Sequence, residues 1–313
     1  MINSIAFLIG TTFMYASPLI FTALGGAISE NAGIINIGLE GMMTIGAFIG
    51  TAVGYFTKNP WLGFLAGGLA GALLALLHAI ASISFKADQV VSGIAINFIG
   101  PGLALFLSRK LFKGATNTIP VPLEHKIPKL FTVLNININT SSPINTIFNQ
   151  DLAVIIALIL TVVIWFVFYK TKYGLYIRTV GEHPKAADSL GISIVKIRYI
   201  AVILSGVLSG FGGATMTLAV ASSFTPTIIS GQGFIALAAV IFGRWKPQGV
   251  LLGALVFGAA QALVITLGGT NINISSQILA MIPYILTLII LISFKGNTSS
   301  PKALGEVYEK GQR

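Results

Sequence analysis

The sequence predicts an all-α fold, a polytopic bundle of about eight to ten membrane-spanning helices. Of its 313 residues, 55% are apolar and only 9% are charged, and the mean hydropathy is +0.88. Soluble domains carry about 25% charged residues, so this chain has too little polar surface to face water. The apolar residues also form runs of about 20, the length that a helix needs to cross a bilayer. We therefore expect one transmembrane domain over residues 1–313.

Eight apolar runs are candidate spans. Their approximate limits are 5–28, 33–56, 61–85, 90–112, 152–170, 198–220, 248–267 and 277–294. Pro101 interrupts the fourth run, which is either one helix or two half-helices. The run from Gly233 to Gly243 is about half a span long. We expect it to be a short crossing or a re-entrant helix buried in protein.

The longest polar segment, residues 114–150, contains four prolines and many asparagines. Within it, Val133 to Thr140 alternates apolar and polar residues, which predicts a short exposed strand. The segment is either a solvated loop or a docking surface for an external partner.

Positive charges predict the orientation. The most basic stretch runs from Lys170 to Arg198, and polar loops rich in lysine and arginine mark the cytoplasmic side. We therefore expect a cytoplasmic loop at 171–197, an extracytoplasmic loop at 114–150 and a cytoplasmic tail at 295–313. Nine crossings with an outside N-terminus satisfy this pattern. The same bias accounts for the net charge of +10, so we expect no nucleic acid partner.

Two regions of the chain look related. Gly33 to Ala79 and Gly231 to Ala262 each begin with an apolar half-helix, break at a proline and continue into a glycine-spaced helix. In the expected topology they run in opposite directions, as inverted repeats do in many transporters. Shared glycine richness is the alternative explanation. Glycines at four-residue spacing, such as Gly46 and Gly50, also predict closely packed helices.

A few polar side chains fall at membrane depth, where they are costly and often face an interior path. Glu40 lies four residues after Asn36, which would place both on one helix face. These groups either line a polar solute path or form hydrogen bonds between helices. The candidates for the path are Asn36, Glu40, Asn97, Gln232 and Gln261.

The sequence lacks the motifs of catalytic and metal sites. It has no cysteine, no Gly-Lys pair of a phosphate-binding loop, no H-E-x-x-H motif and no paired aspartates. Gly231 to Ala236 matches the dinucleotide fingerprint in letters, but a membrane segment follows where a βαβ unit would be needed. We expect no catalytic residues, no metal site and no cofactor bound by this chain.

The predicted cytoplasmic loop carries an ordered pattern, GEHPKAADSLGI, from Gly181 to Ile192. Pro184 favours the first turn of a helix, and the spacing A-A-x-x-x-G allows a short helix to turn sharply against a partner surface. Taken alone, the pattern also suits an ordinary cytoplasmic loop.

Over nearly its whole length, the chain resembles the permease subunits of bacterial ATP-binding-cassette (ABC) importers for ribose, branched-chain amino acids and nucleosides. The run LGGAISENAGIINIGLEGMM, from Leu24 to Met43, is most similar to the nucleoside type. Pro226, Gly233-Phe234 and Pro247 to Gly249 fit the second half of the family pattern. The resemblance implies a type II-like importer membrane domain in the cytoplasmic membrane of a bacterium.

The resemblance also implies partners. One is an ATPase subunit, of tandem type, which would bind the ATP and Mg²⁺; the others are a second related permease, an extracytoplasmic substrate-binding lipoprotein and membrane lipid. ATPase coupling is carried over onto Gly181, Glu182, Pro184, Ala186, Ala187, Gly191 and Ile192. Lys185 stands where the wider superfamily often has a glutamate.

We therefore expect a permease subunit that imports nucleosides and has no nucleotide site of its own. A ribose-type sugar permease is the alternative within the same class. A secondary transporter that uses Glu40 as a proton carrier is an alternative from another class.

Overall fold

The computed structural model describes residues 2–139, 142–268, 275, 278–279, 281–293 and 300–308. These residues form helices and connecting segments without a strand, apart from one isolated bridge between Lys129 and Asp151. Seven helices in this part of the chain are long and apolar enough to cross a membrane. The predicted all-α membrane fold is confirmed.

The helices follow the apolar runs of the sequence. The long ones are α1 (Ile2–Asn31), α2 (Leu39–Thr57), α3 (Pro60–Ala79), α4 (Gln89–Leu111), α7 (Leu152–Lys170), α10 (Ile194–Thr215) and α12 (Pro247–Gly268). Single π-helical segments, Ile80–Ser84 and Met216–Ala221, extend α3 and α10. Two shorter apolar helices are α11 (Gln232–Phe242) and α14 (Ile282–Ser293). The connections contain α5 (Leu130–Val133), α6 (Pro143–Phe148), α8 (Lys172–Glu182) and α9 (Pro184–Ser189).

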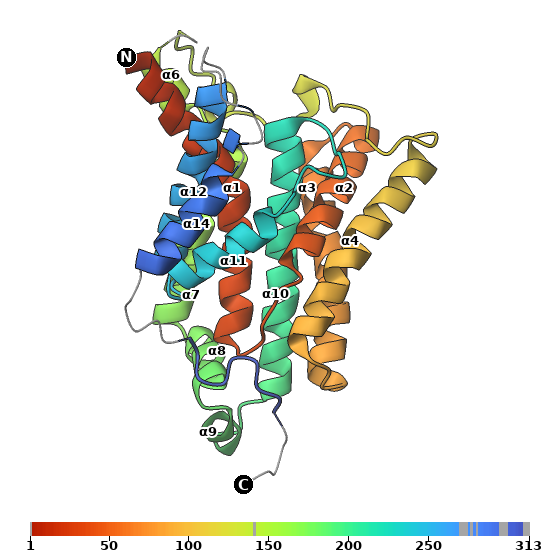
Figure 1. The fold of residues 1–313 in the computed structure, drawn as a ribbon, viewed down its shortest axis with the longest axis vertical. Coiled ribbons are helices and arrows are strands. Elements are labelled where there is room, and N and C mark those ends of the chain that lie inside the picture. The colour runs from red at the N-terminus through yellow and green to blue at the C-terminus, as the bar shows by residue number, and fades with distance from the viewer. Residues whose placement is uncertain are drawn as a thin grey trace.

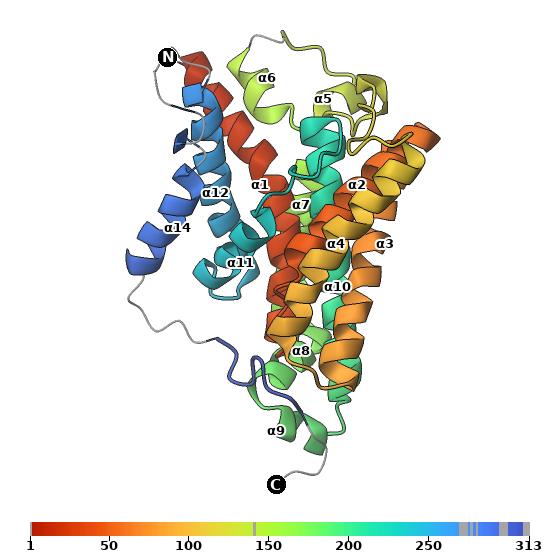
Figure 2. The ribbon, with the colours of Figure 1, turned by 45° about the vertical axis from the view of Figure 1, so that its right-hand side comes forward.

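The molecule has two ends (Figure 1). The α5–α6 end carries the segment between α4 and α7, and the α8–α9 end carries α8, α9 and the described C-terminal residues 300–308. Helix α10 stands in the middle and packs against α1, α2 and α3. Figure 2 shows α4 on one flank and α12 with α14 on the other.

Glycines allow the central helices to approach closely, as their four-residue spacing predicted. A Cβ atom added to Gly46 of α2 would lie 2.5 Å from the Cα atom of Gly210 in α10. Gly63 and Gly67 of α3 likewise face backbone atoms of neighbouring helices. With little hydrophobic drive between helices in lipid, this backbone contact supplies the dispersion energy of packing.

Helices α2 and α11 enter the bundle from opposite ends. Residues 32–38 lead from the α8–α9 end to the middle, where α2 begins and continues to the α5–α6 end (Figure 1). Residues 222–231 lead inward from the α5–α6 end, and α11 continues to the α8–α9 end. The following helices, α3 and α12, then return in opposite directions (Figure 2). The two regions expected to be inverted repeats therefore have inverted arrangements.

The second span begins later than predicted. Gly33, with φ of +87°, ends α1 in the left-handed conformation, and the amide of Ile34 donates back to the carbonyl of Ser29. The chain then runs without helix until Leu39. Asn36 therefore lies before α2, and the prediction that it shares a helix face with Glu40 is wrong.

The structure also decides one open alternative and contradicts one further local prediction. Helix α4 continues through Pro101 as one helix, because a proline removes a single backbone hydrogen bond and can be accommodated in a long membrane helix. The expected strand from residue 133 is absent from the described residues 133–139, where Val133 ends α5. Asn135 adopts a positive φ of 53°, which turns the chain and interrupts the extended alternation.

Candidate functional site

The N-termini of α2 and α11 meet near the centre of the bundle, and Glu40 joins them. Its Oε1 atom accepts a hydrogen bond of 2.6 Å from the amide of Gly231, and its Oε2 atom accepts one of 2.6 Å from the amide of Gly233. The first amides of a helix have no partner inside the helix, and the helix N-terminus is electropositive. The Glu40 carboxylate on α2 therefore caps the N-terminus of α11.

Glycine is required on the α11 side of this contact. Gly231 has a φ of +88°, and a Cβ atom on Gly233 would lie 2.5 Å from the backbone of Glu40. Larger residues at these positions would separate α11 from α2. The G-x-G pattern thus allows the close approach of α11 to Glu40.

Asn97 of α4 closes the start of α2 in a similar way. Its Oδ1 atom accepts from the amide of Gly41 at 2.9 Å, and its Nδ2 atom donates to the carbonyl of Ile37 at 3.0 Å. Glu40 thus satisfies amides at the N-terminus of α11, and Asn97 satisfies backbone groups of Ile37 and Gly41 at the N-terminus of α2. Both predicted path residues belong to one central cluster.

The remaining predicted path residues lie outside these hydrogen bonds, with Gln232 directly beside them. Asn36 is fully buried, and its amide nitrogen donates to Ser205 Oγ of α10 at 2.9 Å. Gln232 and Gln261 line a small cavity of about 20 Å³ between α1, α11, α12 and α14, together with Tyr15. Gln232, at the first turn of α11, connects this cavity to the Glu40 contact.

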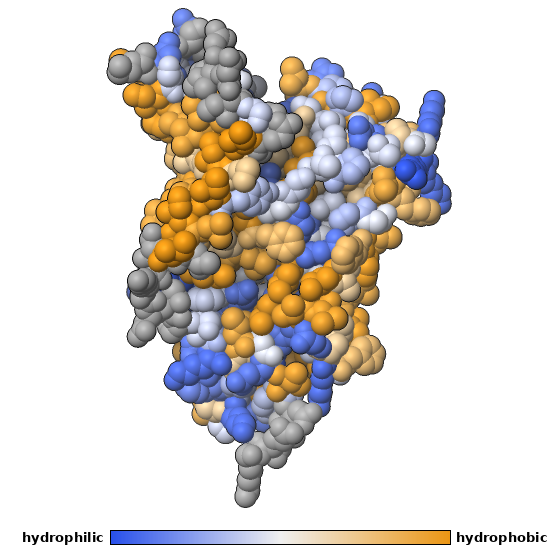
Figure 3. All heavy atoms as spheres, viewed as in Figure 1, coloured by the Kyte–Doolittle hydropathy of each residue, from blue (hydrophilic) through white to orange (hydrophobic). Residues whose placement is uncertain are grey.

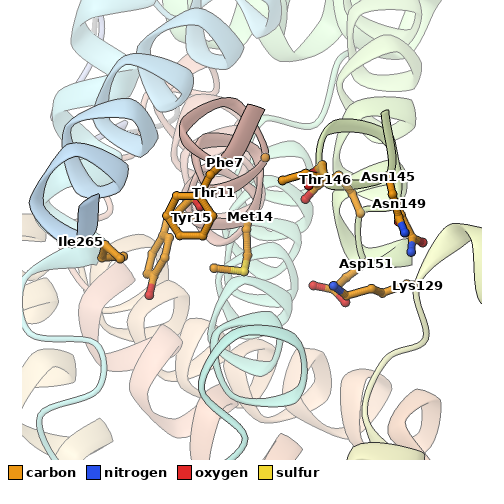
Figure 4. A pocket seen from close by; sticks show the side chains of 12 residues that line it. Phe7, Thr11, Met14, Tyr15, Lys129, Asn145, Thr146, Asn149, Asp151 and Ile265 are labelled. Carbon is orange, nitrogen blue, oxygen red and sulfur yellow. The ribbon is translucent and has the colours of Figure 1, made fainter. Parts of the chain in front are cut away.

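A larger cavity, of about 460 Å³, lies at the α5–α6 end (Figure 4). Side chains of α1, including Thr11 and Tyr15, line one side, and Asn145, Asn149 and Asp151 line the other. Burial raises the pKa of the Asp151 carboxyl group, while nearby lysines oppose the shift. The prediction of a loop or docking surface at 114–150 had not located this cavity, because its other wall comes from α1.

The segment between α4 and α7 is folded onto the bundle. The amide of Leu152 donates to the carbonyl of Pro128 at 3.0 Å, and the amide of Leu130 donates to the carbonyl of Gln150 at 2.9 Å. The amide of Ile127 donates to the carbonyl of Leu218 at 3.1 Å. These contacts order the segment against the ends of α7 and α10.

The predicted coupling residues form α9 and its flanks at the α8–α9 end. Pro184 begins α9, and Gly191, with φ of +77°, follows its end. Ala187 is fully buried against Val180 and Ile194. The inward-facing Ala187 thus attaches α9 to α8 and α10 and leaves its other face available for contact.

The exposed face of this element differs from the predicted set. Glu182 and Ala186 are exposed, and Pro184 and Ile192 are half-buried. Leu190, which the pattern analysis did not select, is 75% exposed. A leucine in an otherwise polar loop was the signal that could have identified it.

The C-terminal segment 300–308 ties the α8–α9 end together. The amide of Ala303 donates to the carbonyl of Gly181 at 2.8 Å, and the amide of Gly305 donates to the carbonyl of Gly33 at 3.1 Å. The guanidinium of the buried Arg198 in α10 donates to the carbonyl of Glu306 at 3.0 Å. Gly181 also packs against the carbonyl of Asn31, which leaves no room for a Cβ atom.

Comparison with known proteins identifies the family. Residues 8–292 match the family model described as "Branched-chain amino acid transport system / permease component". The chain belongs to this permease family. The resemblance first seen in residues 24–43 is confirmed, and with seven long apolar helices among its described residues the protein is a multi-pass membrane protein.

Three relatives match this permease along most of its length. Guanosine ABC transporter permease protein NupQ of Bacillus subtilis is 44% identical and covers 100% of this chain and 99% of its own. Nucleoside ABC transporter permease protein NupC of Lactococcus lactis subsp. cremoris is 39% identical, with 99% of both chains covered. "Putative glucose ABC transporter permease protein TsgC13" of Haloferax volcanii is 34% identical, with 91% of this chain and 90% of its own covered.

Proposed function

We propose that this permease is the membrane subunit of an ATP-driven importer and carries nucleosides across the cytoplasmic membrane of a bacterium. The observation that supports the substrate class is the full-length identity of 44% to a guanosine permease and 39% to a nucleoside permease. The 34% identity to a relative named for glucose keeps a sugar substrate as the alternative to be tested.

The proposed complex contains an ATPase subunit that binds ATP and Mg²⁺, a second related permease and an external substrate-binding lipoprotein. Two Bacillus subtilis proteins named as guanosine ABC transporter permeases, NupQ and NupP, are 44% and 24% identical to this chain. A pair of unequal permeases in one organism supports a heterodimer here.

A continuous set of contacts would carry movement from the ATPase to the centre. The ATPase subunit would dock on the exposed face of α9. Ala187 attaches α9 to α8, and Gly181 at the end of α8 packs against the backbone that leads into residues 32–38. That segment ends at the N-terminus of α2, where Glu40 and Asn97 make their contacts. An ATP-dependent shift of α9 would therefore be transmitted to the junction of α2 and α11.

The proposed path for substrate passes this junction. Neutral nucleosides carry hydroxyl and ring nitrogen groups that amide and carboxylate side chains can bind by hydrogen bonds. Glu40, Asn97 and Gln232 surround the meeting point, with Gln261 on the adjoining cavity. Asn36 would influence the path indirectly, because it binds Ser205 of α10. Separation of α11 from α2 would expose the side-chain oxygen and nitrogen atoms of Glu40 and Asn97 that now bind backbone groups.

Uptake measurements test the substrate class. Cells that lack their own nucleoside importers would express the complete transporter and take up labelled guanosine. Excess unlabelled nucleosides should compete, while ribose and glucose should not. Competition by the sugars alone would support the sugar permease. Uptake that persists without the ATPase subunit and collapses with a protonophore would instead support a proton-coupled carrier.

Matched leucine variants test the coupling surface. Leu190→Glu introduces a charge on the exposed face beside α9, where the leucine is 75% exposed. Leu123→Glu makes the same change at the α5–α6 end, where the leucine is 84% exposed. We expect both proteins to insert and fold, and only Leu190→Glu to lose co-purification of the ATPase subunit. Equal recovery of the ATPase with both variants would refute the assignment.

A further inference from the structure

A third cavity, of about 310 Å³, lies at the α8–α9 end. It is separate from the central junction and from the exposed face of α9. Segments that are distant in sequence meet there: the end of α1, the end of α7 with the adjoining α8, the turn between α11 and α12, and Pro301. Its charged lining residues are Arg178, Glu182, Arg244 and Lys246.

The turn between α11 and α12 is held in a costly conformation. Arg244 and Trp245 both have positive φ angles, of 51° and 57°, which residues other than glycine seldom adopt. Contacts with the end of α1 maintain it: the Trp245 indole donates to the Glu30 carboxylate, and Asn31 Nδ2 donates to the Trp245 carbonyl at 2.9 Å. As a result Trp245 is buried, while Arg244 and Lys246 on either side of it are exposed.

The cavity carries an excess of positive charge. The guanidinium of Arg178 lies over the ring of Tyr169, 5.2 Å from its centroid, and both residues line the cavity together with Arg244. Three cationic groups therefore line the cavity with one carboxylate, that of Glu182. In the described part of the chain, no carboxylate lies within salt-bridge distance of these three cations. An anionic ligand would complete the site.

The surroundings indicate which anion would bind. Next to the cavity, α7 exposes apolar side chains such as Val162 and Phe166, which are 63% and 54% exposed. Tyr169, which lines the cavity and is 36% exposed, is of a residue type enriched at the membrane interface. In Figure 3, hydrophilic surface gathers at the α8–α9 end beside a hydrophobic region. The α11–α12 turn also lies closer to the middle of the molecule than α9 does (Figures 1 and 2).

We propose that this cavity binds the phosphate headgroup of an anionic phospholipid from the cytoplasmic leaflet. Arg244 and Lys246 would contact the phosphate from one side and Arg178 from the other, and the acyl chains would lie along α7. Basic pockets between membrane helices on this side are suited to such headgroups. The lipid would connect α7 and α8 to the α11–α12 turn, whichever substrate the transporter carries.

Native mass spectrometry of the purified full-length protein tests the site. The protein would be delipidated and titrated with phosphatidylglycerol or phosphatidylcholine. We expect tighter retention of phosphatidylglycerol, and about 30-fold weaker retention after the double change Arg244→Gln and Lys246→Gln. The matched control, Arg109→Gln with Lys110→Gln, removes two adjacent exposed cations from α4 at the other end and should leave retention unchanged.

Three outcomes would overturn the proposal. One is equal retention of phosphatidylglycerol by the Arg244→Gln, Lys246→Gln protein and the control. Another is displacement of the lipid by an equal concentration of inorganic phosphate, since the site would then bind the free anion. The third is loss of ATPase co-purification with unchanged lipid retention, which would assign these cations to the ATPase interface. Circular dichroism of each variant checks that its helices are intact.

Discussion

Replacement of Glu40 should weaken the contact between α2 and α11 at the centre of the permease. The carboxylate accepts two backbone hydrogen bonds of 2.6 Å, and each hydrogen bond to a charged group contributes about 1.5–3 kcal/mol. Glu40→Ala removes both and leaves the amides of Gly231 and Gly233 without acceptors, which should cost about 3–6 kcal/mol. Glu40→Gln keeps one acceptor oxygen and should cost about half as much.

Thermal unfolding of the purified protein in detergent measures this effect. Glu40→Ala should lower the unfolding temperature by at least about 5 °C, and Glu40→Gln should fall between it and the wild type. Glu124→Ala is the control, because that side chain is 79% exposed and its loss should change stability by less than about 0.5 kcal/mol. If Glu40→Ala unfolds at the wild-type temperature, the carboxylate does not hold α11 to α2, and a role in substrate binding alone would remain.

Three further predictions test other contacts of the fold. Asn97→Ala removes both contacts of α4 with the start of α2 and should destabilise the protein by about 1–3 kcal/mol in the same unfolding assay. Gly46→Ala would force a methyl group against α10 and should cost about 1–3 kcal/mol, whereas Gly102→Ala, with nothing within 4 Å, should stabilise α4 slightly. The opposite order of the two glycine variants would contradict the packing. Arg198→Gln should release residues 300–308, detected as faster limited proteolysis there, while wild-type cleavage rates would show that this contact is dispensable.

The sequence was sufficient to predict the membrane fold and the helices. Seven of the eight predicted runs are long helices in the described part of the chain, because the length of a span and the cost of unpaired backbone in lipid act locally along the chain. The four-residue spacing of glycines predicted close helix contacts for a similar reason, since that spacing places them on one helix face. The family resemblance in residues 24–43 was likewise contained in a continuous stretch.

The roles of single polar residues were not predictable in this way. Glu40 was a candidate for the substrate path, but its hydrogen-bond partner Gly231 is 191 residues away in sequence. The resemblance assigned Ala187 to ATPase coupling, but only the structure shows that its side chain is fully buried and that Leu190 is exposed. A sequence pattern shows which side chains are costly to bury but not which distant backbone group will satisfy them.

The sequence by itself determined that this protein is a helical membrane protein, because hydrophobic length, charge bias and glycine spacing are properties of short segments. Its permease family followed from the resemblance in residues 24–43. Only the tertiary structure decided that the N-termini of α2 and α11 meet, with the Glu40 carboxylate bridging them. It also placed the C-terminal segment against α8, α10 and the start of residues 32–38. These contacts depend on the packing of segments far apart in the chain, since buried donors and acceptors must find partners wherever the fold brings them.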